Sequence, residues 1–292
     1  MADDWIRISN GTLSAAINPL GAELSSLTDA EGRELMTNAD PRFWTGRAPL
    51  LFPVIGMTAT GAIRIDGQAY PIAKHGFARH SVFSVIETSA TRAVFALADD
   101  QATRASYPFA FRLEVAFELR DATLAIDVTV VNPADEPLPA SFGFHPAFAW
   151  PLPYGQDRAA HRITFEQDEP GDLRVIATDG TIAVEKRPSP LDGRVLRLAD
   201  DLFTNDALVW DPVESRSVRY GVEGAPHLDI AFPDTPKLGI WTKPGAAYVC
   251  VEPWHGIADP EGFDGEFRDK PGVFEVRPRG EQRIAMSITL VG

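Results

Sequence analysis

The sequence contains a single cysteine, Cys250, so a disulfide framework and any metal site built from several cysteines are excluded. Basic residues are also scarce, because 27 Lys and Arg stand against 41 Asp and Glu and give a net charge of −14. Such a chain offers no basic surface to nucleic acid or to an anionic membrane, and we expect neither as a partner. A run of about 18 apolar residues, as a membrane helix requires, is absent as well.

The first four residues, Met-Ala-Asp-Asp, are acidic and lead into alternating sequence instead of an apolar segment. This start is not that of a secretory signal peptide. Together with the unpaired cysteine, it leads us to expect a soluble protein of a reducing compartment, the cytoplasm.

Helical periodicity is missing too, and apolar residues alternate with polar ones almost throughout. Glycine and proline, 23 and 24 in number, interrupt the chain too often for long helices. The pattern predicts an all-β fold, a large antiparallel β-sandwich, with residues 1–292 forming one domain. Proline-rich stretches at 132–139 and 146–153 are interpreted as connections. The clearest alternation lies at 6–17, 63–72, 111–119, 124–130, 273–276 and 284–290, and the last two are predicted to form a hairpin.

Three segments break this alternation, and such breaks tend to mark functional sites. The first is Lys-His-Gly-Phe-Ala-Arg at 74–79. If it is extended, His75, Phe77 and Arg79 share one face and place an imidazole, an aromatic ring and a guanidinium side by side. The alternative is a surface loop with an ion-paired arginine.

The second segment surrounds His145, which sits among aromatic and apolar residues at 141–148. Charging this imidazole is costly unless a partner is near. A histidine in such surroundings is more often a core residue than a catalyst. Pro146 removes a ladder donor, and we expect the strand to stop or bulge there.

The third segment, 248–256, places a carboxylate at the end of an apolar strand. Tyr248, Cys250 and Glu252 share one face of this strand, and valines occupy the other, so we expect Glu252 to be half-buried. A buried glutamate needs a partner or a raised pKa, which suits either general acid–base catalysis or a buried ion pair. Cys250 is interpreted as an inert buried side chain.

Taken in order, these segments resemble the aldose 1-epimerase (galactose mutarotase-like) family, and they are most similar to its smaller, bacterial LacX-type branch. The resemblance covers nearly the whole chain and implies the large antiparallel sandwich of that family. Its motifs are Gly-Ala-Glu-Leu at 21–24, Leu-Phe-Pro-Val-Ile-Gly at 51–56, His-Gly-Phe-Ala-Arg at 75–79, Gly-Phe-His-Pro at 143–146 and Glu-Pro-Trp at 252–254.

The resemblance implies an isomerase that interconverts the α and β anomers of an aldose without metal or organic cofactor. It makes Glu252 the base, His145 the acid and His75 a second active-site histidine that helps to hold the sugar ring. Residues in sugar-contacting or supporting positions are Arg47, Arg79 and Asp206, and from the residue types alone Trp254 or Phe77 stacks on the sugar or belongs to the core. Taken alone, Arg47 is equally suited to a surface ion pair, and Asp206 to a turn.

Departures from the galactose-type pattern, at Gly46-Arg47-Ala48-Pro49 and His75-Gly76-Phe77, mean that galactose specificity is not carried over. A monosaccharide, with or without a phosphate group, is the expected substrate, and a monomer or a homodimer is expected. The alternatives are a hexose-6-phosphate 1-epimerase, a non-catalytic carbohydrate-binding or sugar-sensing protein, a glycosidase using Asp259 as second carboxylate, and a metal site of His75, His145 and Glu252.

Overall fold

The computed structural model describes residues 4–292, and its regular structure is almost entirely β-strand, as the alternating sequence predicts. The acidic start that argues against a signal peptide lies, for residues 1–3, outside the described part. Helical structure in the described residues is limited to α1 (Gln101–Arg104) and to four 3₁₀ turns, η1 (Ala78–His80), η2 (Arg158–Ala160), η3 (Asp200–Phe203) and η4 (Phe267–Asp269). None of these helices in residues 4–292 is long and apolar enough to cross a bilayer.

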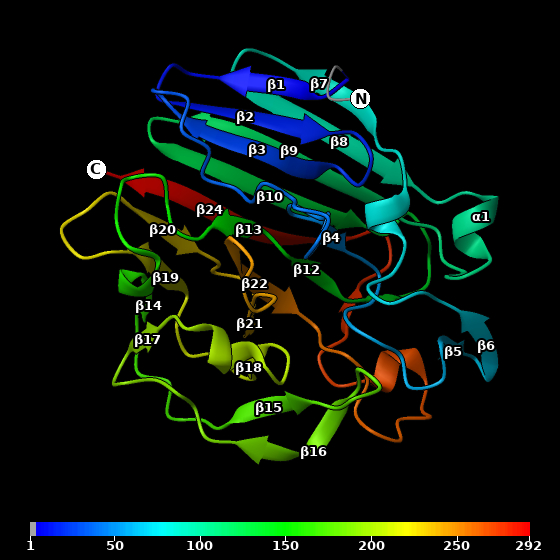
Figure 1. Cartoon of the computed structure of the whole chain (residues 1–292). Helices are drawn as coiled ribbons and strands as arrows, with labels where there is room; N and C mark the ends of the chain where they lie inside the picture. Colours follow the sequence, from blue (N-terminus) through cyan, green and yellow to red (C-terminus); the bar gives the residue numbers. More distant parts are fainter. Residues whose placement is uncertain (1–3) are drawn as a thin grey trace.

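The larger of two main sheets has nine antiparallel strands, with the longest at its centre (Figure 1). Two of them, β9 (Arg112–Arg120) and β10 (Thr123–Val131), form a predicted hairpin in which Leu119 lies opposite Leu124. Alternate residues of β9 are buried, so this sheet turns one apolar face inward. The strand order is β17 (Val195–Arg197), β14 (Arg162–Phe165), β19 (Ser217–Gly221), β20 (His227–Ala231), β24 (Glu281–Val291), β10, β9, β8 (Arg92–Ala98) and β7 (Ser84–Thr88).

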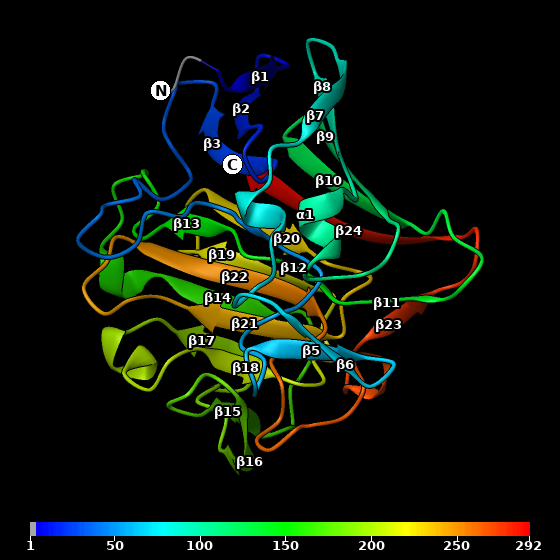
Figure 2. The same ribbon diagram turned by 90° about the vertical axis from the view of Figure 1, so that its right-hand side faces the viewer.

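The second main sheet has eight strands and packs, together with a three-stranded sheet, on the apolar face of the first (Figure 2). Phe117 and Leu124 of the nine-stranded sheet share one core with Val249 of the eight-stranded sheet and Leu13 of the three-stranded sheet. This confirms the antiparallel sandwich. The eight-stranded sheet runs β16 (Ile182–Arg187), β15 (Leu173–Ile176), β18 (Leu208–Trp210), β21 (Lys237–Trp241), β22 (Tyr248–His255), β12 (Phe142–Phe144) and β4 (Leu50–Leu51), with β13 (Ala147–Ala149) also on β22; the third sheet is β1 (Ile6–Ser9), β2 (Leu13–Asn18) and β3 (Glu23–Asp29).

Local pairings confirm two further predicted hairpins and correct a third. The β1–β2 hairpin turns at Asn10-Gly11, and β5 (Ala62–Ile65) pairs with β6 (Gln68–Pro71) around Asp66-Gly67. The predicted C-terminal hairpin is wrong, because β23 (Phe274–Val276) pairs with β11 (Leu138–Ala140), whereas β24 pairs with β10 and β20. The two proline-rich stretches, interpreted as connections, also carry strand residues: Pro139 lies in β11 opposite Glu275, and β13 begins directly after Pro146.

The eight-stranded sheet contains one interruption that positions the site. Both β12 and β13 pair with β22, and the two ladders share one register, because the residue numbers of each pair add up to the same total. Between them the chain passes through His145 and Pro146, where the strand stops as predicted. Continuing the register through this gap places His145 opposite Glu252, and the Val251 N–H donates to the carbonyl of Pro146 at 3.1 Å.

Candidate active site

A cavity of about 300 Å³ lies on the face of the eight-stranded sheet that points away from the shared core. The strand β22 explains this division, because Val249 and Val251 enter the core while Glu252 and Trp254 point the other way. Six of the seven site residues predicted from the sequence line the cavity, namely His75, Arg79, His145, Asp206, Glu252 and Trp254, together with Lys74, Trp44 and Trp241.

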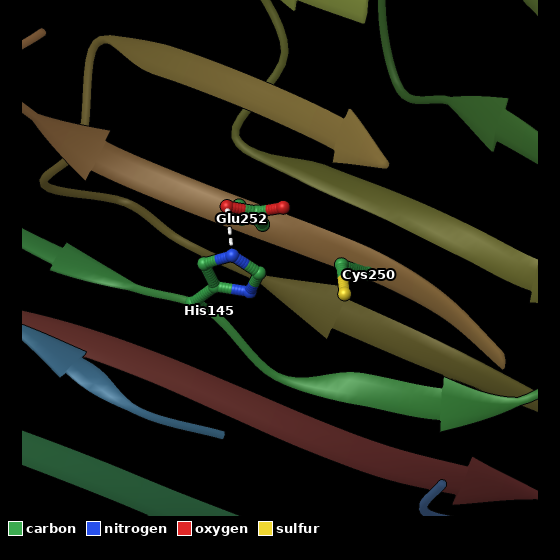
Figure 3. Close-up of side chains that lie close together, drawn as sticks. All are labelled: His145, Cys250 and Glu252. Carbon is green, nitrogen blue, oxygen red and sulfur yellow. Dashed lines mark ion pairs between the residues drawn. The ribbon is translucent and has the colours of Figure 1, made fainter. Parts of the chain in front are cut away.

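His145 and Glu252 meet at the centre of this site (Figure 3). The His145 Nε2 atom lies 3.2 Å from Glu252 Oε2. Only 9% of His145 and 2% of Glu252 are exposed, so Glu252 is more deeply buried than the half-buried position predicted for it. His145 thus combines the two alternatives considered for it: it is buried, and it contacts a possible acid–base partner.

Burial acts on this pair in opposite directions. It raises the pKa of Glu252 well above its ordinary value, and the charge of Asp206 adds to that effect. It lowers the pKa of His145 to about 3. Burial therefore favours the neutral form of each group, the carboxylic acid of Glu252 and the neutral imidazole of His145. The environment of His145, which is predicted to be the acid, thus favours its unprotonated form.

His75 is held in one orientation by its own backbone. The His75 ring Nδ1 accepts a hydrogen bond from the backbone N–H of Gly56 at 3.0 Å. The backbone N–H of His75 donates to the Gly56 carbonyl at the same distance. A neutral imidazole that accepts at Nδ1 carries its proton on Nε2, and burial lowers the pKa of His75 well below its ordinary value. The Nε2–H of His75 is thus available as a hydrogen-bond donor, and the centroids of the His75 and His145 rings are 6.0 Å apart.

The segment around His75 is a turn and not the extended strand that the sequence analysis considered. His75 and Gly76 have φ values of 66° and 73°, and a Cβ at Gly76 would lie 2.1 Å from the Phe52 carbonyl oxygen, so only glycine fits there. Phe77 consequently packs into the core, with its ring 5.8 Å from that of Phe111. The stacking role considered for Phe77 is wrong, whereas His75 and Arg79 still meet in the cavity because the η1 turn brings the chain back.

Charged groups stand at the cavity wall. The Arg79 Nη2 donates to the Lys74 carbonyl at 3.2 Å, and its Nε is buried without a hydrogen-bond partner in the described chain. Asp206 has a φ of 69°, so it is both a turn residue and a lining residue. These groups can orient hydroxyls of a bound ligand. Near Glu252, Lys74 contributes positive charge and Asp206 negative charge.

Arg47 is the predicted site residue that does not line the cavity. Its Nη1 donates to the Thr37 carbonyl at 2.8 Å, and its guanidinium lies 5.7 Å from the ring centre of Trp5. Glu23, from the Gly-Ala-Glu-Leu motif, accepts the N–H groups of Arg47 and Ala48 at 2.8 and 3.0 Å. The motif therefore fixes the chain leading to β4 and makes a structural contribution.

Trp254 belongs to both the core and the cavity. It is 6% exposed and packs in a small cluster with Leu51 and Ile55. Glycines on both neighbouring strands make room for the indole, since a Cβ at Gly143 or Gly239 would lie 2.7 or 2.6 Å from its atoms. The indole is thus locked in place, and its Nε1 has no hydrogen-bond partner among residues 4–292.

Two tryptophans were missed by the sequence analysis. The ring of Trp44 lies 4.9 Å from that of His145, and Trp241 lies 6.0 Å from it and 5.7 Å from Trp44. Trp241 lies opposite Cys250 in the β21–β22 ladder. A correct prediction of this strand pairing would therefore have placed Trp241 near the site. Trp44 lies outside the named strands, and no periodic pattern signals it.

The structure bears on two alternatives, a glycosidase that uses Asp259 and a metal site that includes His75. Asp259 bonds to the buried Lys270 Nζ at 2.8 Å and to the Ala59 N–H at 2.9 Å, so it is committed to structure and does not line this cavity. Among the described residues, a set of potential metal ligands contains His145, Glu252 and Cys250, and not His75. The Nδ1 of His75 already accepts from Gly56.

The chain and its fold have counterparts among known proteins. The family model described as aldose 1-epimerase matches residues 4–274. The plasmid-encoded protein LacX of Lactococcus lactis subsp. lactis is 28% identical over 98% of this chain and 99% of its own.

Two solved structures are similar over nearly their whole length. A galactose mutarotase related enzyme from Lactobacillus acidophilus has a TM-score of 0.91 and 30% identity, covering 99% of this chain and 97% of its own. A galactose mutarotase-like protein from Lactobacillus casei has a TM-score of 0.91 and 27% identity, covering 98% and 100%. The chain belongs to the aldose 1-epimerase family.

Proposed function

We propose that this protein is a cofactor-independent aldose 1-epimerase that interconverts the α and β anomers of an aldose. The observation that supports this most is the direct contact between His145 Nε2 and Glu252 Oε2, 3.2 Å apart in a cavity of about 300 Å³. Opening a hemiacetal requires one group that takes a proton and one that gives a proton, and this pair offers both. The fixed Nε2–H of His75 and the cations at the wall orient the sugar.

In the sugar complex the proton of the pair passes from Glu252 to His145 across the contact between them, and ring opening then proceeds by two proton transfers. The Glu252 carboxylate takes the proton of the C1 hydroxyl, the C1–O5 bond breaks as the C1 carbonyl forms, and protonated His145 delivers its proton to O5. The carbonyl group then turns about the C1–C2 bond, and the ring closes on the other face. On closure, His145 takes the proton from the O5 hydroxyl, and Glu252 returns a proton to the carbonyl oxygen.

Burial of the pair has a specific consequence for this sequence of steps. Ring opening starts from carboxylate and imidazolium and ends with carboxylic acid and neutral imidazole. The second distribution is the one that the dry environment favours, because burial raises the pKa of Glu252 and lowers that of His145. The environment thus stabilises the open-chain complex, in which the bond rotation occurs. Lys74 acts in the opposite direction on Glu252 and limits the cost of its ionisation.

A phosphorylated sugar is the second candidate substrate. Lys74 and Arg79 both line the cavity, and neither forms an ion pair with a carboxylate within residues 4–292. Two cations without such a pairing suit a phosphate group. A neutral aldose remains the first candidate, because Arg79 is already partly engaged by the Lys74 carbonyl.

A sugar panel tests the proposal. Aldoses and their 6-phosphates are scored for binding by saturation-transfer NMR, and every sugar that binds is then followed by polarimetry for accelerated mutarotation. We expect at least one sugar to bind and to mutarotate faster, and Glu252→Gln to bind it without acceleration. Preference for a 6-phosphate that is lost in Lys74→Ala, but kept in Lys186→Ala on the exposed part of β16, would select the phosphorylated substrate. Binding without acceleration by the native protein would contradict the enzymatic proposal and favour a sugar sensor.

A further inference from the structure

The cavity pair has a third neighbour whose chemistry the anomer interconversion does not use. The Cys250 sulfur, His145 and Glu252 each offer one ligand atom, and these atoms lie within 4.8 Å of one another. Figure 3 shows that Cys250 and Glu252 project from β22 towards the same side, where the His145 ring stands. The three side chains are held by paired backbone, because Ala147 lies opposite Cys250 and the gap in the ladder places His145 opposite Glu252.

We propose that this cluster is a binding site for a soft divalent cation, Zn²⁺ or Cd²⁺. One nitrogen, one sulfur and one carboxylate oxygen form a ligand set that suits zinc and its heavier relative, whereas Mg²⁺ and Ca²⁺ take oxygen ligands. Three protein ligands leave the fourth position of a tetrahedral ion for a water or a sugar oxygen on the cavity side. The site is therefore of the open type.

The distances fit an ion after a small adjustment. Ligand atoms about 2.0–2.3 Å from a tetrahedral ion lie roughly 3.3–3.7 Å from one another. The 3.2 Å between His145 Nε2 and Glu252 Oε2 lies just below this range. The sulfur must approach by about 1 Å, and its neighbours Ala147 and Ala246 are small side chains in the same buried cluster.

The three ligands differ in whether they must lose a proton before they can bind a metal ion. A metal ligand histidine must be neutral, and burial keeps His145 neutral by lowering its pKa to about 3. A cysteine binds a metal ion as the thiolate and a glutamate as the carboxylate, so any proton on either group has to leave when the ion binds. Binding therefore releases protons, and we expect the affinity to rise with pH.

Occupation of the site would place an ion on both groups of the proposed acid–base pair. This consequence, inhibition of mutarotation by Zn²⁺, rests on the proposed function. The binding site itself does not, because it needs only the three side chains. Activity without metal and inhibition with metal are then two properties of one cavity.

The single cysteine makes the test direct. Metal-free protein is titrated with CdCl₂ while the ultraviolet thiolate-to-Cd²⁺ charge-transfer band is recorded, and ZnCl₂ binding is measured by calorimetry at several pH values. We expect one equivalent of Cd²⁺ to give the band, and proton release to increase the apparent affinity at higher pH. Since the chain has no other thiol, the band reports Cys250 alone.

Variants then separate the site from non-specific binding. Cys250→Ser and His145→Gln should each weaken Zn²⁺ binding by more than about tenfold, whereas His80→Gln, at an exposed histidine of η1, should leave it unchanged. Circular dichroism establishes that each variant is folded, and Cys250→Ala serves if the serine variant is not. Absence of the band at stoichiometric Cd²⁺, or equal affinity in native and Cys250→Ser protein, would overturn the proposal. A protein that binds Cd²⁺ in this way but accelerates no mutarotation would contradict only the proposed function.

Discussion

The two main sheets share one core but bury their strands differently. In the nine-stranded sheet, β9 alternates regularly between buried and partly exposed residues, and its outer face carries charged side chains such as Glu114 and Glu118. In the eight-stranded sheet, seven of the eight residues of β22 are buried, so both of its faces are covered. The cavity lies on the outer face of this sheet, and burial there alters the pKa values of His145 and Glu252.

This difference separates the sheet that carries the proposed site from the sheet that does not. A strand that faces water on one side can only contribute to stability through its inner face, and its polar residues are solvated. A strand covered on both sides can hold Glu252 and His145 in an environment that disfavours charge. Substitutions in the two sheets should therefore affect different properties, and the following predictions test that separation.

The largest effect is expected on catalysis at Glu252. Glu252→Gln keeps the shape of the side chain but cannot take a proton, so mutarotation of the best-binding sugar should fall by roughly 10²–10⁴-fold. His145→Asn should lose a comparable amount, and the double variant should be little worse than either single one, because the two groups act as a unit. Polarimetry measures the rate, and NMR confirms that the sugar still binds. Near-normal mutarotation by Glu252→Gln would show that the base has been assigned to the wrong residue.

The opposite result is expected in the nine-stranded sheet. Phe117 is fully buried on β9 and packs edge-on against Phe95 at 5.8 Å, so Phe117→Ala should lower the free energy of unfolding by about 3–5 kcal/mol. The kcat and KM of the remaining folded protein should stay close to native. Denaturant unfolding followed by fluorescence gives the stability.

Glu114→Gln, on the outer face of the same strand, provides the matched control and should change stability by less than about 0.5 kcal/mol. A Phe117→Ala protein of native stability, or one with a strongly altered KM, would show that the two sheets are not separable in this way.

The pH dependence of stability should distinguish the cavity pair from ordinary surface carboxylates. Because burial raises the pKa of Glu252 above its unfolded value of 4.5, its contribution is fully present below pH 4.5 and is lost as the pH rises through the raised pKa. Glu252→Gln removes this loss, so the variant should gain stability relative to native protein as the pH increases above 4.5.

His145 has the opposite sign. Burial lowers its pKa from 6.5 to about 3, so its contribution is present above pH 6.5 and is lost as the pH falls towards 3. His145→Asn should therefore be more stable relative to native protein at pH 4 than at pH 7. Thermal or urea unfolding of the three proteins across this range measures both trends, and pH-independent differences would contradict the burial argument.

Much of the fold followed from the sequence because alternation reports directly on a half-buried strand. The β9–β10 and β1–β2 hairpins were predictable since each has local turn residues between two alternating runs. The pairing of β23 with β11 was not, because it joins segments more than a hundred residues apart and no local turn specifies it. Alternation gives the faces of a strand and leaves its partners undetermined.

The site was predictable only in part, for a similar reason. Glu252 and His145 stood out as polar residues in apolar surroundings, and the resemblance supplied their roles. Their contact depends on the register of β12 and β13 on β22, which only the three-dimensional structure shows. Trp44 was not found because it lies outside the strands. For Phe77 both the sugar and the core were considered, and the turn at Gly76, which the alternating pattern does not reveal, directs it to the core.

The smallest effect is expected at Trp254, where the core and the cavity overlap. The indole acts to lower the pKa of Glu252, although no hydrogen bond of normal geometry joins the two in the free protein. Trp254→Phe removes the N–H while keeping an aromatic ring in the slot between Gly143 and Gly239. We expect a few-fold loss of kcat and an upward shift of the acidic limb of the pH–rate profile by roughly half a unit.

Trp210 provides the control for that change. It is also a buried tryptophan whose Nε1 has no partner in the described chain, but it packs in the core shared by the two sheets. Trp210→Phe removes a comparable N–H and a comparable ring volume, so any general loosening of the protein should appear in both variants. Only the cavity variant should move the pH–rate profile, because only there does the lost dipole face Glu252. If the two profiles shift equally, Trp254 acts through packing alone; if only that of Trp254→Phe shifts, the covered face of the eight-stranded sheet tunes the carboxylate through this indole.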